Sequence, residues 1–192
     1  MITFRIDAEE YRRLAEALAR LPLHIEERIL VRATNKAGDM ARTQLRKNVR
    51  AVLGGNMTLS NTNVVTARRA NPANLMYVIK NMRDEVTLSE KYFGKLKWNR
   101  HMAGVKHKAK LVDNPVYGFA TPHKGGVHQS GGGVAFRRTG AARKPIETIK
   151  SPGPMTVFTK HGGKEIFMAT AQSIWPKEAK RLFAVEWKKL QP

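Results

Sequence analysis

A long run of helical periodicity between two chain breaks constrains the fold more than any other feature of this sequence. After Pro22, apolar or small residues recur every three to four positions up to Gly54-Gly55, which predicts one helix over about 23–53. Glycine in mid-helix costs about 1 kcal/mol relative to alanine, so Gly38 indicates a kink or a close contact. The small members of the stripe would let a second helix approach. The stripe comprises Leu30, Ala33, Ala37, Met40, Ala41, Leu45, Val49 and Val52.

Shorter signals flank this helix. Alternation over residues 2–6 predicts a short strand, and Asp7 is placed to cap a helix that ends before Pro22. After the glycine pair, a short helix is expected to start at Thr58 or Ser60 and to run towards Arg69. The N-terminal third is therefore predicted to be mainly helical.

The remaining sequence shows strand-like alternation of apolar and polar residues first, and helical periodicity towards its C-terminal end. Segments 75–81 and 85–93 are predicted to be paired strands, and 133–138 reads as another strand. Residues 164–174 are predicted to be a helix that Trp175-Pro176 breaks or restarts. The order predicts an α+β fold, with long N-terminal helices, a central, mostly antiparallel β-region and a C-terminal helix.

Charge is distributed unevenly along the chain. Lysine and arginine number 35 against 15 acidic residues, a net charge of +20, and residues 41–144 hold twenty basic and four acidic side chains, a net +16. Such a block is expected to face a polyanion or an acidic protein. Within it, residues 95–133 are rich in glycine, histidine and lysine and are predicted to form an extended excursion from a single domain over 1–192.

Two groups of basic residues are candidates for facing DNA or a protein partner. Arg42, Arg46 and Arg50 share one helix face, which is either solvated or directed at a ligand, and we expect a protein partner there because apolar residues flank them. A second group lies in the 137–144 region, where DNA is favoured because Glu147 is the only nearby acid. The further candidates are Arg68, Arg69, Arg137, Arg138, Arg143 and Lys144.

Several classes of function are disfavoured. Cysteine is absent, and the histidine spacings match no common zinc motif, so we expect no metal and no cofactor. Carboxylates in the basic block are few and scattered, which argues against a metal-dependent nuclease and against an enzyme in general. No apolar run approaches the length of a membrane span, and the N-terminus lacks the pattern of a signal peptide, so a soluble protein is expected.

The stretch "VAFRRTGAARKPIETIKSPGP" joins an aromatic-basic strand to a turn and a proline-rich ending. It resembles a sequence mark of the phage minor tail protein Z family, the tail-completion proteins of long-tailed phages. Elements elsewhere in the chain follow the same order as in that family. The residues that carry the resemblance are Phe136, Gly140, Arg143, Pro145, Ile146, Gly153 and Pro154.

This resemblance implies a structural virion protein that completes or terminates a tail and joins it to the head. It implies a homo-oligomeric ring, most simply a hexamer, in contact with tail tube and head–tail connector proteins around a DNA channel. The expected location is the tail or neck of the virion, and the host cytoplasm during assembly. A sequence-independent nucleic-acid-binding protein for packaging or for a nucleoid is the open alternative.

Overall fold

The computed structural model describes residues 16, 18–19, 21–80, 82–99, 104–112, 116–117, 127–129, 133–138 and 146–190. The strand expected over 2–6 and most of the helix expected after Asp7 lie outside these ranges. The helices are α2 (Leu23–Leu53), α3 (Met57–Asn63), α4 (Glu90–Phe93), α5 (Pro154–Lys160) and α6 (Gly163–Leu190).

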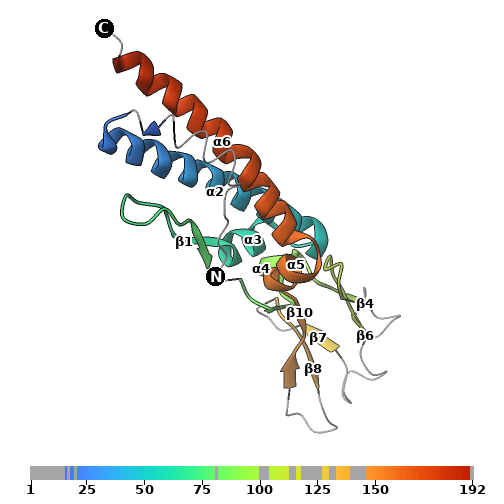
Figure 1. Cartoon of the computed structure of the whole chain (residues 1–192). Coiled ribbons are helices and arrows are strands. Elements are labelled where there is room, and N and C mark those ends of the chain that lie inside the picture. The colour runs from blue at the N-terminus through green and yellow to red at the C-terminus, as the bar shows by residue number, and fades with distance from the viewer. Residues whose placement is uncertain are drawn as a thin grey trace. The chain divides into compact units, whose positions relative to one another are not determined.

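Short strands occupy the sequence between the two long helices (Figure 1). All of their pairings are antiparallel, in the sheets β1–β2, β3–β10, β4–β5–β6 and β7–β8–β9. The predicted α+β class is therefore confirmed. The strands are β1 (Val65–Arg68), β2 (Val78–Lys80), β3 (Glu85–Thr87), β4 (Lys97–Asn99), β5 (Gly104–Lys106), β6 (Val116–Tyr117), β7 (Val127–Gln129), β8 (Ala135–Arg138), β9 (Ile146–Thr148) and β10 (Lys150–Pro152).

The chain divides into two compact units. Unit 1 comprises Met1–Leu45, Val65–Lys80 and Lys164–Pro192, and unit 2 comprises Arg46–Val64 and Asn81–Gly163. Helix α2 contributes its first part to unit 1 and its last part to unit 2. The expectation of one domain over the whole chain stays a prediction.

Unit 1 is built on the packing of α2 against α6. Ala33 and Ala37 are fully buried in one cluster with Trp175, whose indole N–H donates to the hydroxyl of Thr34 at 3.0 Å. The small side chains bring the second helix close, as the sequence predicts. The cluster comprises Leu18, Leu21, Ile25, Ile29, Leu30, Ala33, Ala37, Trp175, Ala179 and Leu182.

Helix α6 does not break where the sequence suggests. The expected interruption at Trp175-Pro176 is wrong, because Pro176 lies inside a continuous helix. A proline in a helix interior costs about 3 kcal/mol. Burial of its neighbours Trp175, Ala179 and Leu182 in the unit 1 core offsets that cost.

Two predictions made from the sequence are wrong around the β1–β2 hairpin. Residues 65–68 are a strand and not the end of a helix, because Val65 and Thr66 are β-branched and pair with Lys80 and Ile79. The predicted pairing of segment 75–81 with segment 85–93 is also wrong. β3 pairs with β10, and residues 90–93 are helical.

Unit 2 contains the end of α2, the helices α3, α4 and α5 and the sheets β3–β10, β4–β5–β6 and β7–β8–β9. Gly54 ends α2 with φ +74°, and a Cβ there would overlap the carbonyl of Lys108. Asn56 then caps α3 by accepting a hydrogen bond from the Leu59 amide at 3.1 Å. Fully buried apolar residues of this unit include Val49, Leu53, Leu59, Val64, Leu88, Val105, Ala135 and Val157.

Candidate interaction surface

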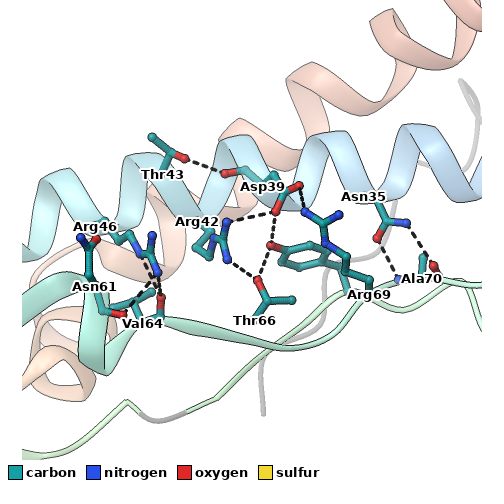
Figure 2. Close-up of polar contacts among 11 residues, drawn as sticks. Asn35, Asp39, Arg42, Thr43, Arg46, Asn61, Val64, Thr66, Arg69 and Ala70 are labelled. Carbon is teal, nitrogen blue, oxygen red and sulfur yellow. Dashed lines mark hydrogen bonds and ion pairs between the residues drawn. The ribbon is translucent and has the colours of Figure 1, made fainter.

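The first arginine of the α2 row, Arg42, lies in a network centred on Asp39 within unit 1. Figure 2 shows Arg42 and Arg69 converging on the Asp39 carboxylate from two sides. The nitrogen–oxygen distances are 3.2 Å for Arg42 and 2.5 Å for Arg69. Arg42 also donates to the hydroxyl of Thr66 in β1 at 2.5 Å. Helix α2 therefore holds the β1–β2 hairpin through a carboxylate shared by two guanidinium groups.

Tyr77, next to the first residue of β2, completes this network. Its hydroxyl donates to Asp39 at 2.7 Å and lies 2.7 Å from the Thr66 hydroxyl. Burial raises the pKa of Tyr77 above 10.0, and Asp39 raises it further, while the Thr66 hydrogen bond and Arg42 act in the opposite direction. The tyrosine ring covers Gly38, where any Cβ would overlap it. The close contact expected at Gly38 is thus with this ring.

Asn35 adds a second clamp one turn earlier on α2. Its side-chain amide donates to the carbonyl of Ala70 at 3.0 Å and accepts from the amide of the same residue at 2.9 Å. This pair of bonds fixes the end of β1 against α2, and the Asn71–Asn74 pair closes the turn that follows. Asn35, Asp39 and Arg42 thus form one hairpin-binding face of the helix.

The second arginine of the row, Arg46, caps a helix in unit 2. Its guanidinium donates to the carbonyl of Val64 at 2.7 and 3.0 Å and to that of Asn61 at 3.4 Å, as Figure 2 also shows. These carbonyls lie at the C-terminal end of α3, where a cation is favoured. Arg50 donates from Nε to the Arg46 carbonyl at 3.4 Å. The row therefore makes internal contacts along its length.

The other basic candidates are placed differently. Arg68 is exposed, and Arg137 is more than half exposed and lies 3.7 Å from Glu147, its cross-strand partner in β9. An exposed pair of this kind contributes little stability. Arg138 belongs to β8, but its side chain, like Arg143 and Lys144, lies outside the described part of the chain.

The family-like stretch forms strands followed by a helix start. Phe136 lies in β8, and Ile146 begins β9 opposite Arg138. Gly153 precedes α5, its amide donates to the Asp84 carbonyl at 2.5 Å, and a Cβ there would overlap the Arg83 carbonyl. Pro154 occupies the first helical position, which suits proline. The remaining mark residues, Gly140, Arg143 and Pro145, lie outside the described ranges.

Histidines and carboxylates form no metal-binding cluster within the described ranges. His107 is buried, and its Nδ1 accepts from the Ala109 amide at 3.2 Å. An open hollow in unit 1 contains a single carboxylate, from Glu27. Its lining comprises His24, Glu27, Arg28, Val31, Arg32 and Pro72. The expectation that the chain is not an enzyme stays a prediction.

A set of exposed lysines was not among the candidates drawn from the sequence. Exposure alternates in unit 2 from Lys95 to Lys97 and again from Val105 to Lys110, and every exposed position in these two runs is a lysine. The alternation of lysine with apolar residues and His107 at period two was the available signal. This set, the lysine face, comprises Lys95, Lys97, Lys106, Lys108 and Lys110.

Comparison with known proteins found no match: no protein-family model, no curated protein and no solved structure matches this chain. None of the helices in the described ranges has both the length and the apolarity that a bilayer crossing requires. The resemblance of the 134–154 stretch therefore remains an expectation from the sequence.

Proposed function

We propose that this chain is a structural virion protein that completes or terminates a phage tail and joins it to the head. It acts as one subunit of a homo-oligomeric ring, a hexamer in its simplest form, around the DNA channel. Its contacts in the virion are with itself, with tail tube proteins and with head–tail connector proteins. Its role is assembly by shape and charge, with no turnover of a substrate.

The observation that carries the proposal is the residue pattern from Phe136 to Pro154. Phe136 lies in β8, Ile146 begins β9 and Pro154 begins α5, and two small or rigid residues of the stretch have specific backbone roles. Gly153 is required by contact with the Arg83 carbonyl, and Pro154 starts α5. These roles support reading the stretch as a structural element rather than as a phosphate-binding loop.

The charge distribution supports the same proposal. A net charge of +20 on each copy would oppose ring closure unless DNA or acidic neighbours offset it. The internal bonds of Arg42 and Arg46 remove part of the basic block from external binding. The remaining basic side chains stay available to bind a polyanion, as expected of a subunit in a ring around DNA.

Native mass spectrometry and electron-microscopy class averages of the purified, nucleic-acid-free protein test the proposal. We expect one closed ring of fixed subunit number, with six copies as the specific prediction. A monomer that associates only on DNA, without fixed stoichiometry, would favour the packaging or nucleoid alternative. Nuclease treatment before the measurement separates the two, because a ring held by protein contacts survives it.

A further inference from the structure

We propose that the lysine face is a DNA-binding surface that contacts the phosphate backbone of duplex DNA without reading its sequence. Four of its members, Lys95, Lys97, Lys106 and Lys108, carry the binding. The placement of this surface in a ring around DNA rests on the function proposed above. The binding itself is a property of unit 2 and is measurable on the purified protein.

The lysines project from an ordered and buried base. Leu96, Val105 and Ala109 are at most 3% exposed, whereas the lysines that alternate with them are exposed. Lys110 also anchors the segment. Its backbone amide donates to the carbonyl of Leu53 at 2.9 Å, and its Nζ donates to the carbonyl of Ala51 at 2.8 Å. The face is therefore held in place before any ligand binds, which lowers the ordering cost of binding.

Two of these lysines are paired with each other. Lys97 and Lys106 are directly opposite in the β4–β5 ladder, and like charges at such positions destabilise a sheet. The sequence supplies no acidic residue between Glu90 and Asp113. Among the described residues, none of the four binding lysines forms an ion pair. Repulsion of this kind is relieved when an external polyanion binds.

Spacing and residue type favour DNA backbone over an acidic protein. Alternate strand positions repeat every ~6.6 Å, close to the rise of two phosphates along one strand of B-DNA. Lysine acts as a hydrated point charge, which suits phosphate contact, and it has neither the fixed planar fork of arginine nor the paired donor and acceptor of a side-chain amide, both of which favour the reading of base edges. The five members of the lysine face include neither, so binding independent of sequence is expected.

The test compares two variants with the same loss of charge. The first is Lys97→Gln/Lys106→Gln/Lys108→Gln, and the matched control replaces three exposed lysines of α6 in unit 1. Affinity for a short duplex of mixed sequence is measured over a range of salt concentrations. Each lost phosphate contact lowers the slope of log affinity against log salt by ~0.9, so the first variant should lose ~2.7 and the control less than one. The control substitutions are Lys164→Gln, Lys180→Gln and Lys188→Gln.

A third variant, with arginine at the three lysine-face positions, keeps the charge and should keep the wild-type slope. Equal slopes in the first variant and the control would overturn the inference. So would a first variant that binds DNA normally but fails to join heads to tails, because that result assigns the face to an acidic protein. Ring formation by each variant is measured separately. Rings with no difference in salt slope between the first variant and the control refute this inference alone. A difference in salt slope without rings counts against the proposed assembly alone.

Discussion

Replacing Asp39 by asparagine tests whether part of the basic block serves inside unit 1 rather than at its surface. The substitution keeps the shape of the side chain but removes its charge and replaces one acceptor oxygen by an NH2 group. Asp39 uses both carboxylate oxygens, Oδ1 for Tyr77 and Arg42 and Oδ2 for Arg69. Asparagine has one acceptor oxygen, and its NH2 group would face a cation on the other side. The variant should therefore lose at least one bond and gain a repulsive contact.

The size of the effect follows from exposure. A hydrogen bond to a charged group contributes about 1.5–3 kcal/mol, against about 0.5–1.5 kcal/mol for a neutral one. The Arg42 side chain is 22% exposed, so its bond to Asp39 retains most of this free energy. The Arg69 side chain is 60% exposed, so its bond contributes little after solvent screening. We expect a total loss of about 2 kcal/mol in the free energy of unfolding. For a chain of this length that corresponds to a decrease of about 4–8 °C in Tm.

Thermal unfolding followed by circular dichroism measures the change. Glu147→Gln is the matched control, because Glu147 lies 3.7 Å from Arg137 and both side chains are more than half exposed. Its replacement should change the stability by less than about 1 kcal/mol. If both variants lower Tm equally, or if Asp39→Asn has no effect, the Asp39 network does not hold the hairpin as described.

Three further outcomes are expected. Gly38→Ala, which stabilises an ordinary helix, should here destabilise by about 1–3 kcal/mol because the new methyl group overlaps a buried ring, and thermal unfolding shows the sign. The hydrogen bond from Arg181 lowers the pKa of Glu178 below 4.5, so the stability difference between wild type and Glu178→Gln should be present at neutral pH and vanish as pH falls below 4.5; a constant difference would contradict this. Lys97→Glu, opposite Lys106, should raise stability by about 0.2–1 kcal/mol in denaturant unfolding, and a loss would argue against the β4–β5 register.

The sequence predicts helices better than strand partners. Helix α2 matches its predicted span because a long stripe at one period specifies the element and most of its buried face, although Met40 of the stripe is exposed. Strands of three residues carry too few alternations to specify a partner. β3 pairs with β10 from far along the chain, whereas the sequence favoured the nearer segment 75–81. Local pattern also misplaced the end of α3, because it does not contain the tertiary pairing of β1 with β2.

For the candidate surface, the sequence identified the arginine row but not its contacts. The acceptors of Arg42 and Arg46 are Thr66 and the Val64 carbonyl, and no sequence spacing reveals that these lie beside α2. The Asp39 contribution was partly predictable, since a carboxylate three positions before an arginine on a helix forms a favourable pair. The lysine face was predictable from the sequence, because lysines at alternate positions of a strand lie on the same face.

Arginine and lysine divide the positive charge of this chain for a physical reason. A guanidinium is weakly hydrated and presents several donors in a fixed plane, so it can bridge Asp39 and Thr66 while 22% exposed. An ammonium is strongly hydrated and is costly to bury, so the lysines of the exposed face stay in water, where they can exchange counterions for phosphates. Net charge in the sequence therefore overstates the charge available to a partner. The residues to test first for DNA contact are the exposed lysines of unit 2, ahead of the arginines of α2.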